Sequence, residues 1–170
     1  MLAHKNSSGF TLVELAITLA ILAILTTLGL PSFLGMLESG RIKAAASGFA
    51  MGLQRARAEA ISRGQTIFFV PAASGAGWVI STDDAGTNVV EQKDSRESGG
   101  AQITLSATTV IGFNNLGRAT TGAPATFNFS GPTGCSAEPR CLRVQVFTGG
   151  QVRLCDPAVT DTTDTRSCGS

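Results

Sequence analysis

The sequence predicts an α+β protein in which one long N-terminal helix packs on antiparallel β-sheets. Three observations lead to this fold class. Residues 10–30 form an apolar run in which Glu14 is the one charged residue. Apolar residues then recur at helical spacing up to Ala60, and beyond Gly64 short β-rich runs alternate with turn residues. A chain of 170 residues is long enough for one domain of ordinary size with a short appendage.

The apolar run is long enough for a membrane-spanning helix. Its 21 residues span roughly 30 Å as a helix, which is about the thickness of the hydrocarbon layer. A cleaved secretory signal has a shorter apolar region of about 7–15 residues and a small-residue cleavage site, whereas this run ends at Leu30-Pro31. Lys5 precedes the run, and no Asp or Glu lies among the first nine residues, which favours a cytoplasmic N-terminus. We therefore expect residues 10–30 to stay in the membrane.

Residues 31–64 are expected to continue the helix as an amphipathic segment. Pro31 predicts a kink, because its ring removes one backbone hydrogen bond and clashes with the preceding turn. Gly64 follows a basic last turn and predicts the end of the helix. One face carries an apolar stripe that predicts packing against a sheet, formed by Ile42, Ala46, Phe49, Leu53, Ala56 and Ala60.

Residues 65–170 are expected to form a β-rich domain. The clearest hairpin turns at residues 148–150, where pairing Val146 with Val152 places Val144 opposite Leu154 and matches the apolar faces. The polar residues from 160 onwards predict a loosely packed tail. Strands are predicted near residues 66–70, 78–81, 89–92, 103–106, 110–113, 126–129, 142–147 and 151–154.

Charge and composition exclude several classes of function. The 13 Lys and Arg against 12 Asp and Glu give a formal charge of +1, so no basic coat for nucleic acid is present. His4 is the only histidine, so beyond the N-terminus no histidine is present for catalysis or metal ligation. Asp83-Asp84 lies in a turn sequence, which favours a hairpin turn over an acid pair or calcium site. We expect no enzymatic activity, cofactor or metal, against the alternative of an anchored periplasmic enzyme.

Glu14 needs a partner, because an ionised carboxylate at a helix centre costs roughly 2.5–3.5 kcal/mol on insertion scales. The segment from Ser8 to Glu14 reads S-G-F-T-L-V-E and resembles the class III signal of type IV prepilins and pseudopilins. The resemblance implies that a prepilin peptidase removes the leader 1–9 after Gly9 and methylates the new amine of Phe10. In a filament, the Glu14 carboxylate would then pair with the Phe10 ammonium of a neighbouring subunit.

Three later segments narrow the resemblance to the minor pilins and pseudopilins of GspH/FimT type. Residues 53–65 resemble the helix-to-strand junction of that family, residues 111–119 its mid-domain strand and turn, and residues 149–155 its last hairpin. The resemblance implies a type IV pilin-like fold and a structural subunit of a type IV pilus or a type II secretion pseudopilus. The sequence is compatible with a subunit of either machine.

The same resemblance implies the partners and the location of the chain. The partners would be the prepilin peptidase, other major and minor pilins or pseudopilins, and the inner-membrane assembly platform. The chain would be a single-pass protein of the bacterial inner membrane with a periplasmic domain, extracellular once it is in a filament.

The four cysteines predict structural disulfides. Residues on the outer side of the membrane meet oxidising conditions, and the spacing of these thiols does not suit zinc. Three connectivities are open for Cys135, Cys141, Cys155 and Cys168. We favour Cys135–Cys141, which closes a short loop, with Cys155–Cys168, which ties the tail to the last strand.

Four polar residues make DNA a candidate partner. In the predicted register, Arg143 and Arg153 are diagonal neighbours on one strand face that Gln151 shares, and Arg118 lies on a loop. Arginines on a neutral domain can hold DNA phosphates. Some FimT-like proteins bind DNA through a C-terminal G-R-x-R motif, and the matching residues 150–153 here read G-Q-V-R, with glutamine at the first arginine. The alternative is a solvated strand face.

Overall fold

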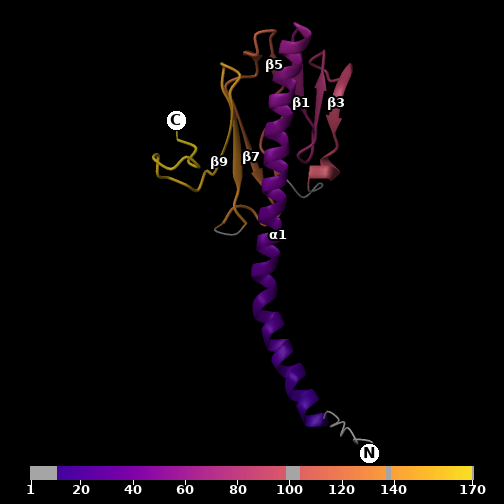
Figure 1. Ribbon diagram of the computed structural model, residues 1–170, viewed down its shortest axis with the longest axis vertical. Helices are drawn as coiled ribbons and strands as arrows, with labels where there is room; N and C mark the ends of the chain where they lie inside the picture. The colour runs from indigo at the N-terminus through magenta and orange to yellow at the C-terminus, as the bar shows by residue number, and fades with distance from the viewer. Residues whose placement is uncertain (1–10, 99–103, 137–138, 170) are drawn as a thin grey trace, which may run out of the picture. The chain divides into compact units, whose positions relative to one another are not determined.

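The computed structural model describes residues 11–98, 104–136 and 139–169, without the side chains of residues 28, 29, 31 and 32. The chain divides into two compact units, Met1–Gly35 and Met36–Ser170. One helix, α1 (Leu12–Arg63), contributes to both units (Figure 1). The predicted long N-terminal helix is therefore confirmed.

The first unit contains the N-terminal part of α1. Thr11 caps the helix: its carbonyl accepts a hydrogen bond from the Leu15 N–H (3.1 Å), and its hydroxyl accepts one from the Glu14 N–H (3.2 Å). The large apolar side chains of this part of α1 are exposed, for example 84% at Leu12 and 53% at Ile21. Within the described part of the chain, no helix has an apolar stretch of sufficient length to cross a membrane. The helix continues through residue 31, and the kink at Pro31 stays a prediction.

The second unit holds two antiparallel sheets. The five-stranded sheet has the order β3-β2-β1-β5-β6, and the four-stranded sheet has the order β4-β7-β8-β9. The strand predicted near residues 66–70 is β1, which lies at the centre of the five-stranded sheet. The first sheet contains β1 (Ile67–Pro71), β2 (Trp78–Ser81), β3 (Val89–Lys93), β5 (Ile111–Phe113) and β6 (Ala119–Thr121). The second contains β4 (Thr104–Leu105), β7 (Ala125–Ser130), β8 (Leu142–Val146) and β9 (Val152–Cys155), and a 3-10 turn spans Ser95–Ser98.

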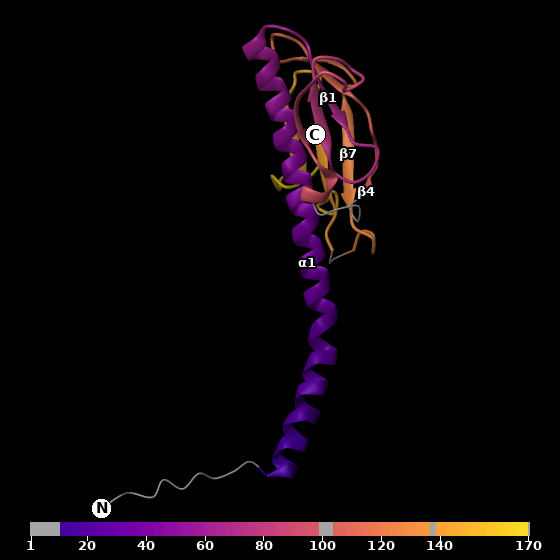
Figure 2. The ribbon, with the colours of Figure 1, turned by 90° about the vertical axis from the view of Figure 1, so that its right-hand side faces the viewer.

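The helix and both sheets share one core. In this unit both sheets lie on one side of α1 (Figure 2). The Phe49 ring of α1 lies 4.8 Å from Phe69 of β1, and 5.0 and 5.2 Å from Phe127 and Phe129 of β7. One aromatic side chain thus joins the helix to both sheets. All six residues of the predicted apolar stripe are fully buried, namely Ile42, Ala46, Phe49, Leu53, Ala56 and Ala60.

The last hairpin has the predicted register. Val146 pairs with Val152, and Val144 pairs with Leu154. Val144 and Val146 are buried and face the core, so the alternate residues of β8 lie on the outer face of the sheet. The register therefore decides which polar side chains of this sheet are available on the outside.

Two parts of the domain differ from the sequence-based expectation. The strand β6 was not predicted, because its sequence Ala119-Thr120-Thr121 is short and polar and pairs with β5 through an irregular register. The tail was expected to pack loosely, and most of residues 160–169 is exposed, but Ser167 is anchored to the domain. Asp156 and Ser167 form a β-bridge, and both residues are buried.

A close contact between α1 and β2 leads to a stability prediction. A Cβ atom at Gly52 would lie 2.6 Å from Cε2 of the buried Trp78, whereas a Cβ at Gly40 would meet nothing within 4 Å. We expect Gly52→Ala to lower the free energy of unfolding by about 1–3 kcal/mol through overpacking. Gly40→Ala is the matched control and should raise it by up to about 1 kcal/mol. Urea denaturation of both variants measures the difference, and equal stabilities would contradict the packing.

Candidate functional site

The residues of the predicted processing signal fall at the edge of the described chain. Gly9 and Phe10 lie outside the described residues. Glu14 lies in the first turn of α1, where its side chain is exposed. Among the described hydrogen bonds, the Thr11 hydroxyl caps this end of the helix, and the Glu14 carboxylate has no part in the cap. This carboxylate is therefore available to a partner outside the helix.

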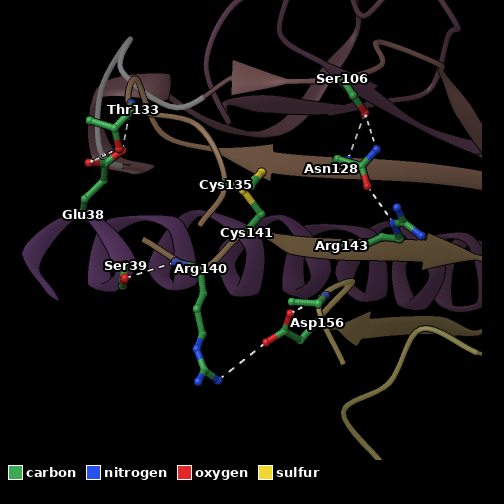
Figure 3. The surroundings of a disulfide bond; sticks show 11 residues. Glu38, Ser39, Ser106, Asn128, Thr133, Cys135, Arg140, Cys141, Arg143 and Asp156 are labelled. Carbon is green, nitrogen blue, oxygen red and sulfur yellow. Dashed lines mark hydrogen bonds and ion pairs between the residues drawn. A yellow bond between two sulfur atoms is a disulfide. The ribbon is translucent and has the colours of Figure 1, made fainter. Parts of the chain in front are cut away.

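Two disulfides cross-link the second unit. Cys135 bonds to Cys141, and Cys155 bonds to Cys168. These are the two pairs favoured from the spacing. The first closes a loop of the β7–β8 connection, and the second ties the C-terminal tail to β9 (Figure 3 shows the first). Each bridge reduces the conformational freedom of an irregular segment that has few apolar residues to hold it.

Helix α1 holds the loop between β7 and β8 through polar contacts. The Glu38 carboxylate accepts a hydrogen bond from the Thr133 hydroxyl at 2.9 Å, and the Ser39 hydroxyl accepts one from the Arg140 N–H at 3.3 Å (Figure 3). Arg140 also lies 3.8 Å from the carboxylate of Asp156. Sequence reasoning missed these contacts, because about 100 residues separate the partners and neither segment has a motif that points to the other.

The predicted arginine face exists, but its two arginines have partners. Arg143 is opposite Cys155 and Gln145 is opposite Arg153, which makes the two arginines diagonal neighbours on the outer face. The Arg143 Nε donates a hydrogen bond to Oδ1 of Asn128 at 2.7 Å. Arg153 donates to the tail: Nη1 to the Gly169 carbonyl at 2.9 Å and Nη2 to the Ser167 carbonyl at 2.7 Å.

The other two candidates lie at the end of the hairpin. Gln151 is exposed and directly precedes β9, and Arg118 is exposed in the turn before β6. The neighbouring Ala119 N–H donates a hydrogen bond to the carbonyl of Thr148, which brings this turn against the hairpin end. The structure thus brings Arg143 and Arg153 to one face, with Gln151 at the end of the hairpin and Arg118 in an adjacent turn.

Arg153 and the second disulfide explain why the tail is ordered. Arg153 binds carbonyls on both sides of Cys168, and the Asp156 N–H donates a hydrogen bond to the Arg166 carbonyl at 2.7 Å. Within the tail, the Asp164 carboxylate accepts hydrogen bonds from Arg166, which lower the pKa of Asp164 to about 2. The polar tail is therefore held by side-chain hydrogen bonds and one covalent link rather than by apolar burial.

The acidic pair after β2 forms a turn, as predicted. The Asp83 carboxylate accepts hydrogen bonds from the N–H groups of Thr87 (2.9 Å) and Asn88 (2.6 Å). The Thr87 backbone N–H is the main cause that holds the pKa of Asp83 below its usual value. In the described residues, no group of three or more His, Cys, Asp or Glu is placed to hold a metal ion.

This architecture defines the class of protein. A long N-terminal helix that packs on antiparallel sheets is the type IV pilin-like fold, and solved structures agree. The type IV minor pilin FimU of Pseudomonas aeruginosa is 21% identical, with a TM-score of 0.51 over 66% of this chain and 90% of FimU. The minor pseudopilin EpsH from the Type 2 Secretion System of Vibrio cholerae is 22% identical, with a TM-score of 0.51 over 70% of this chain and 99% of EpsH. At these identities the likeness shows the fold.

Family models identify the chain more closely. The model of the Type II transport protein GspH matches residues 45–150, and the model of the prokaryotic N-terminal methylation motif matches residues 4–30. The chain belongs to the GspH family and is a minor pilin or pseudopilin. A search of curated proteins finds no significant match.

Proposed function

We propose that the chain is made as a precursor, cut after Gly9, methylated on Phe10, and then drawn from the membrane into a filament as a structural subunit. The observation that carries the proposal is the methylation motif at residues 4–30, which coincides with the predicted signal. The exposed apolar side chains between Leu12 and Leu25 and at Leu30 support it further, because a helix that is apolar all round requires an apolar environment.

The proposal includes a topology and a set of partners. The basic N-terminus would stay in the cytoplasm, residues 10–30 would cross the inner membrane, and the β-rich domain would lie in the periplasm. Two disulfides fit that oxidising compartment. The partners are the prepilin peptidase, other pilins or pseudopilins and the assembly platform. The role is structural, and the filament is either a type IV pilus or a type II secretion pseudopilus.

Replacing the residue before the cleavage site tests the proposal. We expect Gly9→Ala to leave an unprocessed precursor, because the peptidase cuts after a glycine at this position in the signal that the chain resembles. The precursor would appear as a slightly heavier band, and mass spectrometry would find the intact leader. Gly40→Ala is the control and should mature normally, because Gly40 lies far from the motif. Normal maturation of Gly9→Ala would refute the proposed processing site.

DNA binding is the second candidate function, and one observation favours it. The register brings Arg143 and Arg153 to one outer face of the domain, and Gln151 directly precedes β9. On this hypothesis, Arg143→Ala and Arg153→Ala would each weaken the binding of a DNA duplex several-fold at low salt, because each removes a phosphate contact. Gel-shift titration of the full chain in detergent measures the affinity. Unchanged affinity in both variants would exclude this face as a DNA site.

A further inference from the structure

A hollow of about 480 Å³ opens on the outer face of the four-stranded sheet. Its floor is polar, with Asn128 of β7 and Arg143 of β8, which form a cross-strand pair. Its walls are mostly apolar and constrained, and Ser136 adds one hydroxyl to them. The Cys135–Cys141 disulfide forms part of one wall, and Pro157 and Ala158, which follow the disulfide-bonded Cys155, form part of another. Both disulfides therefore hold the shape of this hollow.

The guanidinium of Arg143 is fixed in the hollow by a chain of hydrogen bonds. The Ser106 hydroxyl accepts hydrogen bonds from the Asn128 backbone N–H (3.0 Å) and from Nδ2 of Asn128 (3.3 Å). This orients the Asn128 amide so that Oδ1 accepts the hydrogen bond from Nε of Arg143 at 2.7 Å (Figure 3). Since Nε is engaged, the two Nη groups remain as an oriented pair of donors.

The charge of Arg143 has no counter-ion in the described structure. The side chain is half-buried, yet none of the ion pairs among the described residues includes it. Asp156, which precedes the wall residues, is engaged elsewhere: it accepts from the Ala158 N–H at 2.9 Å and lies 3.8 Å from Arg140. A partly desolvated cation without a counter-ion favours an anionic ligand.

The shape and the donors of the hollow favour a carboxylate over other anions. Two parallel N–H donors of a guanidinium match the two oxygens of a carboxylate. The apolar walls suit the methylene stem of an aspartate or glutamate side chain. A nucleic acid backbone would need a row of available cations, whereas the neighbouring Arg153 already donates to the carbonyls of Ser167 and Gly169.

We propose that this hollow binds the carboxylate of an acidic side chain from a neighbouring subunit of the filament, with Arg143 as the direct contact and Asn128 and Ser106 as positioning residues. The proposal rests on the proposed function, since a filament subunit is the partner. It adds a second charge-pairing contact, in the β-rich unit, to the one at Glu14. The group bound at Arg143 is a protein carboxylate, whereas the group bound at Glu14 is a terminal amine.

Solution NMR of the full ¹⁵N-labelled chain in detergent micelles tests the chemistry. The probe is the α-amide of N-acetylglutamate, which has one side-chain carboxylate, and the neutral isostere is the α-amide of N-acetylglutamine. We expect the carboxylate to shift the Arg143 Nε–H and Ala158 N–H signals saturably, and the isostere to cause no saturable shift. Arg143→Gln should abolish the Ala158 shift, and Asn128→Ala should weaken binding at least three-fold. Arg96→Gln, which alters an exposed arginine of the Ser95–Ser98 turn outside the hollow, should bind as the unaltered chain does.

Three results of this titration would overturn the proposal. The first is equal binding by the isostere or by the Arg143→Gln chain, provided that its amide spectrum shows a folded domain. The second is a DNA duplex that binds at Arg143 when the carboxylate does not, which would assign the hollow to nucleic acid. The third concerns Glu138, a carboxylate of the same disulfide-closed loop that lies outside the described residues. If Glu138→Gln alone shifts the Arg143 Nε–H signal as far as saturating probe does, the chain's own carboxylate is the occupant.

Cross-linking in cells identifies the source of the carboxylate. A benzophenone amino acid at position 158 of the full chain should form an adduct with another pilin or pseudopilin, identified by mass spectrometry. The adduct should be lost with Arg143→Gln and kept with Arg96→Gln. An adduct that is independent of Arg143, or no pilin adduct, would overturn the proposal. Failure of the proposed function would be distinguished from failure of the Arg143 contact, because in that case the unaltered chain itself would be absent from sheared filaments.

Discussion

Glu14→Leu is expected to reach the membrane and to be processed, but to be lost from filaments. Leucine is more favourable than glutamate in hydrocarbon, so membrane insertion should not suffer. In the filament, however, the ammonium created at Phe10 would lack its counter-ion. Removing one partner of a buried ion pair costs about 3–5 kcal/mol, which corresponds to a more than hundred-fold loss of incorporation. Immunoblots of sheared filaments against membrane fractions measure this ratio.

A control on the same helix separates charge from hydropathy. Thr18 lies one turn further along α1, is exposed, and its hydroxyl donates only to the Leu15 carbonyl at 2.9 Å. Thr18→Leu therefore makes the helix more apolar without removing a charge, and its incorporation should be normal. If Glu14→Leu is incorporated as well as Thr18→Leu, the Glu14 carboxylate has no pairing role. Loss in both variants would mean that added hydropathy, not the missing charge, prevents assembly.

Phe49→Ala is expected to produce the largest loss of stability in the β-rich unit. Phe49 is fully buried, and its ring lies within 5.2 Å of aromatic rings from both sheets. Truncation of a buried phenylalanine to alanine costs about 3–5 kcal/mol, because the apolar contacts are lost and a cavity remains. A domain of this size has a total stability of only about 5–15 kcal/mol. Thermal or urea unfolding of the chain in detergent should show a large shift, with part of the protein unfolded at 37 °C.

The neighbouring Met51 supplies the control for this prediction. Met51 lies two residues along α1, but its side chain is 64% exposed. Met51→Ala should change the free energy of unfolding by about 0.5 kcal/mol or less. Comparable losses in Phe49→Ala and Met51→Ala would contradict the special contribution of the junction of the two sheets to stability, because alanine does not lower helix propensity at either position.

The parts of the fold that were predicted correctly follow from short-range periodicity. The stripe from Ile42 to Ala60 has the repeat of a helix, and each of its residues is buried. The hairpin register follows from the alternation of Val144 and Val146 against Val152 and Leu154, because a shift by one residue would reverse the faces. Local pattern decides these features, so local sequence reveals them.

The features that were not predicted depend on partners distant in sequence. The Asn128 amide is oriented by Ser106, 22 residues away, and the Thr133 hydroxyl by Glu38, 95 residues away. Ordinary polar residues make these contacts, and their types alone do not identify the partner. The anchoring of Ser167 was not predicted for the same reason, since it depends on the side chain of Arg153 as well as on the disulfide. Even so, the spacing of the cysteines pointed to the bridge that holds it.

The position of the tail has a consequence for crowded filaments. β9 is the terminal strand of its sheet, and such strands offer unpaired N–H and C=O groups to which strands of other molecules can add. Where β9 ends, the chain returns so that Asp156 and Ser167 form a parallel bridge, and Cys168 bonds back to Cys155. These C-terminal residues thus cover part of the exposed edge of the sheet. Subunits concentrated side by side can then touch through side chains without merging their sheets into an aggregate.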